Sequence, residues 1–451
     1  MAGLPGNPLL VRARIQANLH TQDDFVIAFQ DKAFELGIDA TVTVRQVRRW
    51  ESPAPGWPHP TARTVLTALF GRPPEALGFR RRVRSVPPDA DRTSEAPDRS
   101  EDGGEMQRRA FVSHSLAMVG SAAIPTCPGD VLHVLGSDPL DGIRDVLTGT
   151  AGAQEPGTVA SLRRDLTEAK RLVQACNYAR LARQLPAFLA RFERPGSALP
   201  EQRALDLLAV HAYHVAATLL LKYDDAASAW IAAEKAAAAA RRTEAPAAIA
   251  SAYRILAHAV AAVGHRRQAV RVAVTGIDRL SSRVSGSVPD NVTVFGALLL
   301  RGAWVAALCE DRDTAAELLD EAERTAALLQ EATNRQWTAF GANNVALHRL
   351  SIALAFGDAG HALQAARTVV PAQLAVAERQ ATYWADVARA LHGCGRTEAA
   401  ARALLAAEND APEEVRSRSV TRELIGELLQ RDRTGRVSGL RALASRATVR
   451  V

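Results

Sequence analysis

Side chains that could hold a metal or carry out catalysis are few in this 451-residue chain. His211 and His214 are three residues apart on a predicted helix and could both contact one metal ion, but no third ligand lies near them in the sequence. The sequence also lacks a GxGxxG, a Walker loop, an HExxH and a GxSxG motif. We therefore predict a protein that is not an enzyme, with no metal site and no cofactor.

Near the N-terminus, the residues best suited to binding another molecule are arginines. Residues 1–84 hold 12 Arg and Lys against 7 Asp and Glu, a net charge of +5, whereas the whole chain carries +6. A small basic head on a nearly neutral body is typical of a nucleic-acid-binding module attached to another domain. Arg45, Arg48 and Arg49 fall within one short predicted helix, and a guanidinium can donate two hydrogen bonds to guanine O6 and N7.

A compact unit of four helices is predicted to position these arginines. Thr21 at the N-cap and Asp24 three residues later form a capping-box pattern, which starts the second helix. The third helix is predicted over Val44–Glu51, after Thr41 or Thr43 as its cap. Within it Val47 and Trp50 share a face and should anchor the helix to the core. The first and fourth helices are predicted to begin after Asn7 and Pro60.

This head resembles the Xre/Cro-type helix-turn-helix fold. The matching words are residues 21–25, TQDDF, in the second helix, residues 47–51, VRRWE, in the recognition helix, and residues 68–78 in the closing helices. The spacing from Phe25 to Val47 exceeds that of compact phage repressors, which implies a longer second helix or a loop around residues 38–42. The resemblance implies that Val44, Arg45 and Arg49 enter the major groove of double-stranded DNA. It also implies that the phosphates are contacted by Gln22, Thr43, Gln46 and Arg48.

From about residue 158 onward the pattern is helical almost without a break, and no period-two alternation indicates a sheet. Short turns of similar form recur about 40 residues apart, each between a long apolar helix and an Ala-rich one. This is typical of an α-solenoid built of helix pairs. The motif Gly-x-x-x-(Gln/Glu)-Ala at the turns resembles tetratricopeptide (TPR-like) repeats. The five turns are residues 223–226, 264–269, 311–315, 357–362 and 395–399.

The concave surface of a solenoid is lined mainly by the first helix of each pair. Counting back ten residues from three of the turns gives His214, Arg254 and Arg301, so polar residues recur at one register. Arg and Asn side chains are suited to holding peptide backbone and carboxylates. We predict a peptide or protein effector on this surface, contacted by His214, Arg254, Arg301, Trp304, Asn343 and Asn344, with Tyr253, Trp337, His348 and Trp384 on neighbouring faces.

Composition divides the chain into five segments. They are a DNA-binding domain over 1–80, a flexible linker over 81–105, a connecting segment over 106–157, a helical repeat domain over 158–432 and a C-terminal tail over 433–451. Arg108-Arg109-Ala110-Phe111 reads like a twin-arginine export signal, but it lies behind a whole domain. We interpret it as part of an apolar helix that docks on the body. No run of 18 uninterrupted apolar residues predicts a membrane span.

These features together predict an all-α protein: a helix-turn-helix head plus a TPR-like α-solenoid. The predicted function is a cytoplasmic transcriptional regulator that binds double-stranded DNA, senses a peptide or protein partner and forms a homodimer through its body. One head reads few base pairs, so specific control usually needs two. The alternative is a protein-interaction scaffold whose head no longer binds DNA.

Overall fold

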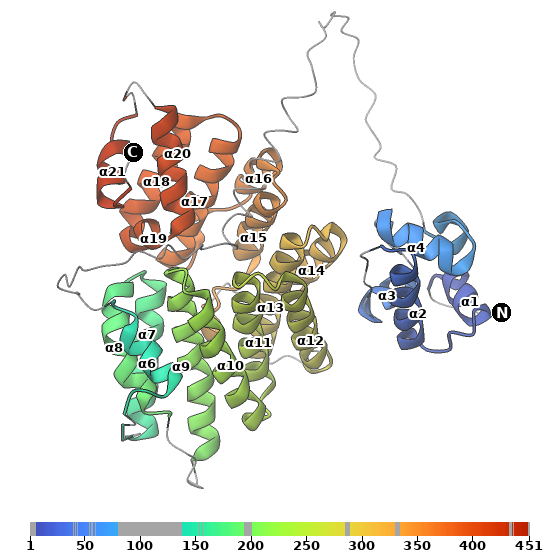
Figure 1. The fold of residues 1–451 in the computed structure, drawn as a ribbon, viewed down its shortest axis with the longest axis horizontal. Coiled ribbons are helices and arrows are strands. Elements are labelled where there is room, and N and C mark those ends of the chain that lie inside the picture. The colour runs from blue at the N-terminus through green and yellow to red at the C-terminus, as the bar shows by residue number, and fades with distance from the viewer. Residues whose placement is uncertain are drawn as a thin grey trace, which may run out of the picture. The chain divides into compact units, whose positions relative to one another are not determined.

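The computed structural model describes residues 6–79 and 138–449, apart from 39, 41, 43, 54, 56, 59, 153, 156, 194–200, 285–288, 330–333, 433, 434 and 436. Every regular element within these ranges is a helix, so the prediction of an all-α fold is confirmed. The chain divides into two compact units at residues 99 and 100, drawn in Figure 1. We call residues 6–79 the head and residues 138–449 the body. The predicted linker 81–105 and the Arg108-Arg109 segment lie outside the described residues.

The head contains the four predicted helices and one short 3-10 helix. They are α1 (Pro8–Gln16), α2 (Gln22–Glu35), α3 (Val44–Trp50), α4 (Pro60–Phe70) and η1 (Pro74–Leu77). The predicted caps are confirmed: Asn7 Oδ1 accepts from the backbone N–H of Leu10, and Thr21 and Asp24 form a reciprocal capping box. These bonds satisfy backbone donors that a helix start would otherwise leave unpaired.

The aromatic core of the head fixes α3. Val47 and Trp50 are 0% and 3% exposed, as their shared face predicted. The Trp50 ring lies 6.3 Å from that of Phe25 and 5.8 Å from that of Phe79, both close to edge-on. Asn7 Nδ2 donates to the backbone oxygens of Trp50 and Leu77, at 3.0 and 2.9 Å. The N-terminus, α3 and η1 are therefore held together by one buried amide as well as by apolar packing.

The body is built of six helix pairs. They are α7 (Val159–Gln174) with α8 (Tyr178–Ala190), α9 (Gln202–Lys222) with α10 (Ala226–Thr243), α11 (Pro246–Ala262) with α12 (Arg266–Val284), α13 (Pro289–Leu308) with α14 (Arg312–Ala326), α15 (Ala342–Ala355) with α16 (Ala359–Ala366), and α17 (Ala377–Gly393) with α18 (Thr397–Asp410). Around them lie α6 (Asp141–Thr148), α19 (Pro412–Ser417), α20 (Ser419–Arg431), α21 (Leu440–Arg446) and the short η2 (Arg335–Trp337) and η3 (Pro371–Gln373).

The turn inside each pair contains one residue in the left-handed conformation. The five predicted turns lie where the sequence placed them, with positive φ at Asp224, Gly264, Glu310, Gly357 and Gly395. A sixth turn of the same kind joins α7 to α8 at Cys176, whose φ is 55°. A residue in the left-handed conformation ends the first helix and lets the chain reverse direction. Gly adopts this conformation at no steric cost. Because Cys stands there, the sequence showed no Gly signal for this first pair.

Small apolar residues let the helix pairs pack closely. On α10, Ala229, Ala232, Ala233 and Ala236 are fully buried.

The segment predicted as a C-terminal tail is part of the body. It contains α21, whose buried Leu440 and Leu443 belong to the last core cluster of the body.

Helices α9 and α13 are long and apolar enough to cross a membrane, but 67% and 78% of their most apolar windows are buried within the body. Their apolar faces are thus occupied by other helices.

The first helices of the six pairs form a closed ring. Each of α7, α9, α11, α13, α15 and α17 contacts the next in order, and α17 contacts α7. A bonded cluster near this junction ties the two ends of the body together. Lys222 Nζ on α9 lies 2.7 Å from carboxylate oxygens of both Glu378 on α17 and Glu414 on α19. Side chains that face inward from the six helices therefore converge on one space.

Candidate functional site

On the head, the structure brings the start of α2 next to α3. Arg48 Nε donates to Gln22 Oε1 at 3.0 Å, and Gln22 Nε2 donates to Glu51 Oε2 at 2.7 Å. Glu51 also pairs with Arg14 at 2.6 Å, with side-chain exposures of only 9% and 10%. A buried ion pair of this kind is costly to break once formed. The chain of contacts from Arg14 to Arg48 fixes how the two predicted phosphate-contacting residues, Gln22 and Arg48, lie relative to α3.

The other predicted DNA-contacting residues lie on or beside α3. Val44, Gln46 and Arg49 are half-buried in α3, and Arg48 is exposed. Arg45 lies in α3 with its side chain outside the described part of the structure, and Thr43 is outside the described residues. Since Val47 and Trp50 hold one face of α3 in the core, Arg48 and Arg49 are left to the remaining faces.

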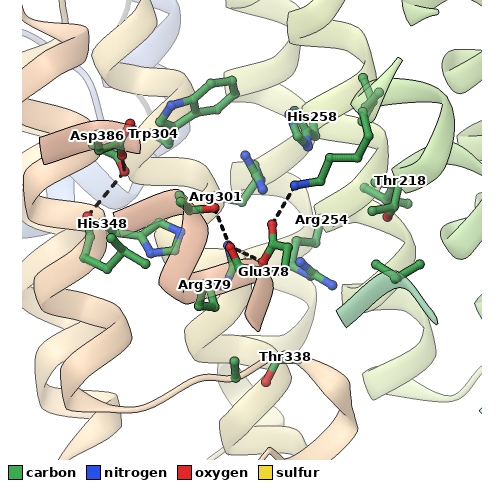
Figure 2. Close-up of a pocket in the computed structure, with 18 of the residues that line it drawn as sticks. Thr218, Arg254, His258, Arg301, Trp304, Thr338, His348, Glu378, Arg379 and Asp386 are labelled. Carbon is green, nitrogen blue, oxygen red and sulfur yellow. Dashed lines mark hydrogen bonds and ion pairs between the residues drawn. The ribbon is translucent and has the colours of Figure 1, made fainter. Parts of the chain in front are cut away.

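In the body, the ring of helices surrounds a cavity of about 410 Å³. His214, Arg254 and Arg301, predicted from their register before the turns, all line it, and so does Trp304. Figure 2 shows Arg254, Arg301 and Trp304 in this lining. These four residues come from α9, α11 and α13, which are neighbours in the ring. Trp337 and His348 line it as well. The volume is that of a small-molecule pocket.

Asn343 and Asn344 do not line the cavity. The Asn343 side chain is bonded to the backbone of Val370, donating at 2.8 Å and accepting at 2.9 Å. Asn344 is 4% exposed, and its backbone oxygen contacts His348 Nδ1 at 2.9 Å. Both residues lie at the start of α15, where Asn343 bonds to the Val370 backbone and Asn344 is buried within the body. The sequence prediction placed them in the groove because it used residue type alone. It could not include the rotation of α15 about its axis, which decides the side chains that face the cavity.

His214 orients Arg254 through a defined tautomer. Arg254 Nη2 lies 3.0 Å from His214 Nε2, and His214 Nδ1 lies 3.1 Å from Ser251 Oγ. A guanidinium only donates, so Nε2 must accept and Nδ1 must carry the proton that it donates to Ser251. Burial, then the nearby Arg254, holds the pKa of His214 well below its ordinary value. The imidazole stays neutral and positions the guanidinium.

Trp304 positions Arg301 in a similar way. The guanidinium carbon of Arg301 lies 5.0 Å from the centre of the Trp304 ring, a cation–π contact. His258 packs edge-on against the same ring at 5.2 Å. Burial, followed by Arg301, lowers the pKa of His258 well below the usual value. The two arginines are thus held by neutral or aromatic partners.

Two carboxylates of the cavity, Glu378 and Asp386, have cationic partners. Glu378 lies 2.7 Å from Lys222 and 3.4 Å from Arg379. Burial by itself would raise the pKa of Glu378, but Arg379 and Lys222 outweigh it and hold the pKa below its ordinary value. Asp386 accepts from Ser351 at 2.5 Å and pairs with Arg389 at 3.2 Å. Glu378 therefore stays ionised, and both Glu378 and Asp386 already have cationic partners.

Histidine contributes no charge to the cavity at neutral pH. Burial, then Lys170, lowers the pKa of His211 to about 3, and burial with Arg379 does the same to His348. Within the described ranges, no group of three or more His, Cys, Asp or Glu could hold a metal ion. The cavity is a cationic and aromatic site whose histidines act as neutral hydrogen-bonding groups.

Several lining residues were not predicted from the sequence. His258 lies four residues after Arg254 on the same helix face, so extending the register by one turn would have found it. Lys170, Glu378 and Arg379 had no such signal. They reach the cavity because α7 and α17, which are more than 200 positions apart, meet to close the ring.

Comparison with known proteins gave no match: no family model, no curated protein and no solved structure matches the chain.

Proposed function

We propose that this protein is a DNA-binding transcriptional regulator with an Xre/Cro-type helix-turn-helix head and a TPR-like body, acting in the cytoplasm. The observation that carries the proposal is the contact between Gln22 at the start of α2 and the exposed Arg48 of α3, at 3.0 Å. Helix starts offer backbone amides to phosphates, and a fixed Gln and Arg beside them add side-chain donors. The net charge of +5 over residues 1–84 supports an anionic partner.

A gel shift of the full chain on a fragment of its own promoter tests this function. Specific binding should weaken steeply between about 50 and 200 mM salt. Arg45→Ala or Arg49→Ala should lower specific binding by ~1–3 kcal/mol and relax the base choice at one position. Arg48→Ala should weaken binding to all sequences alike.

Lys32→Ala is the matched control, because Lys32 pairs with Glu35 at the far end of α2 from Gln22. Its DNA affinity should equal that of the wild type. The proposal fails if the wild type binds the promoter no more tightly than a scrambled fragment of equal length. Wild-type affinity of both the Arg45 and the Arg49 variants would refute the major-groove roles.

We propose that the body binds a peptide or protein effector in its cavity and joins two chains into a homodimer. The convergence of His214, Arg254 and Arg301 on one cavity supports the effector half. A ligand changes DNA affinity only if it binds the DNA-competent arrangement differently from the other. Replacing Arg254 and Arg301 together should abolish the effector response and leave apo DNA binding intact. Sedimentation of the full chain as a monomer at micromolar concentration would contradict the dimer.

The second candidate is an interaction scaffold whose head binds protein. Ile27 and Phe34, seven residues apart on one face of α2, are 59% and 88% exposed. Exposed apolar side chains two helical turns apart are typical of a protein contact. The gel shift separates the two candidates, since a scaffold gives no specific promoter complex. Ile27→Ser with Phe34→Ser should then remove partner binding, whereas a DNA-binding head should keep its promoter affinity in that variant.

A further inference from the structure

The cavity of the body contains more cations than its carboxylates can neutralise. Its described lining includes eight Arg and Lys side chains against three Asp and Glu side chains. Glu378 forms ion pairs with Lys222 and Arg379, and Asp386 forms an ion pair with Arg389. The remaining cations of the lining have no ion pair with either of these two carboxylates.

Of the five other cations, Arg418 pairs with Glu414 and Arg266 donates to the backbone oxygen of Leu308, which leaves three. Among the described residues, no carboxylate lies within ion-pairing distance of Lys170, Arg254 or Arg301. Their partners are instead the Trp337 ring, neutral His214 and the Trp304 ring. The Nε atoms of Arg254 and Arg301 are buried and have no hydrogen-bond partner. Buried donors left unpaired in this way are unusual in folded proteins and call for a ligand that satisfies them.

We propose that the cavity binds a small anion, a carboxylate or phosphate compound whose charged group lies between Arg254 and Arg301 with Lys170 beside it. The inference rests on the proposed role of the body as the effector-binding part. A guanidinium presents a planar fork of donors that fits carboxylate and phosphate oxygens. The cavity of about 410 Å³ suits a small molecule or the end of a peptide rather than a folded protein.

The electrostatics of the cavity agree with this assignment. Burial, followed by repulsion from Arg254, lowers the pKa of Arg301 to about 9, and burial with Arg379 lowers the pKa of Arg254 to about 10. Cations that destabilise one another in this way are stabilised by an anion placed among them. The aromatic rings of Trp304 and Trp337 offer apolar surface for the rest of such a ligand.

Isothermal titration calorimetry on the full chain tests the inference with two probes, citrate and inorganic phosphate. At least one should bind with one site per chain. Arg254→Gln with Arg301→Gln should weaken that binding roughly tenfold or more, because both guanidinium forks are removed. Lys170→Met should weaken it by a smaller factor. The matched control is Arg163→Gln with Arg402→Gln, which removes the same charge from exposed positions and should bind as the wild type does.

The source of the anion is distinguished by trialanine with a free or an amidated C-terminus. Tighter binding of the free acid than of the amide identifies the ligand as a peptide carboxylate. If neither trialanine form binds but citrate or phosphate does, the ligand is a small molecule. The inference is overturned if neither anion binds up to about 10 mM, or if the surface control loses as much affinity as the cavity variant. Anion binding without promoter binding rejects the DNA-binding role alone. Promoter binding without anion binding rejects this inference alone.

Discussion

Replacing Lys170 by Met should stabilise the ligand-free protein. The Lys170 ammonium lies 5.8 Å from the Trp337 ring and has no carboxylate partner among the described residues. Burial, followed by Arg254, lowers the pKa of Lys170 from 10.5 to about 8. At 1.36 kcal/mol per pKa unit, this fall corresponds to a penalty of roughly 3 kcal/mol at neutral pH. Loss of the cation–π contact offsets ~0.5–1 kcal/mol, so we expect a net gain of ~1–3 kcal/mol in the free energy of unfolding.

The pH dependence of that gain has a definite sign. Between pH 8 and 10.5 the unfolded chain keeps the Lys170 proton while the folded protein has lost it. The unfolded state then binds more protons, so this group makes the free energy of unfolding rise with pH across that window. The advantage of Lys170→Met over the wild type should therefore be complete below pH 8 and vanish towards pH 10.5. Other groups that titrate there are common to both proteins and cancel in the difference.

Urea unfolding followed by far-UV circular dichroism, at pH 7 and pH 10, measures both quantities. Lys235→Met is the control, because Lys235 pairs with Glu193 at 2.8 Å and its removal should bring no gain. Two results would refute the reasoning. One is a Lys170→Met protein no more stable than the wild type at pH 7, and the other is a difference that is as large at pH 10 as at pH 7.

Two further substitutions test the packing of each unit. Trp50→Ala should destabilise the head by ~3–5 kcal/mol, since a 3%-exposed aromatic leaves a cavity, whereas Phe34→Ala, at an 88%-exposed position, should change little. Thermal unfolding of the head monitored by near-UV circular dichroism compares them, and equal effects would contradict the proposed core. Gly296→Ala should lower the Tm of the body, because its Cβ would lie 1.9 Å from the Phe340 ring, while Gly152→Ala meets nothing within 4 Å. A Gly296→Ala protein that melts with the wild type would show that Phe340 can move freely.

Local patterns were enough to predict most of the secondary structure. The capping box at Thr21 and Asp24 acts over three residues, so residue types alone predict it. The five turns were found because Gly, or an Asp cap, stands where the chain must reverse. The turn at Cys176 was missed because its left-handed residue is not Gly and its conformation is imposed by packing. Register before the turns also placed His214, Arg254 and Arg301 on one surface.

Tertiary packing decided what the cavity contains. Which face of each helix turns inward depends on how one pair rotates against the next, and contacts such as Gly296 against Phe340 set that rotation. Neighbouring residues in the sequence do not determine this rotation. For that reason Asn343 and Asn344 were predicted to lie in the groove, although they lie outside the cavity. Closure of the ring between α7 and α17 brings Lys170 and Glu378 to one space across more than 200 residues. The sequence alone determined the helices and their turns. The charge balance of the cavity arises only when distant helices meet, because burial and the neighbouring side chains decide which cations are paired.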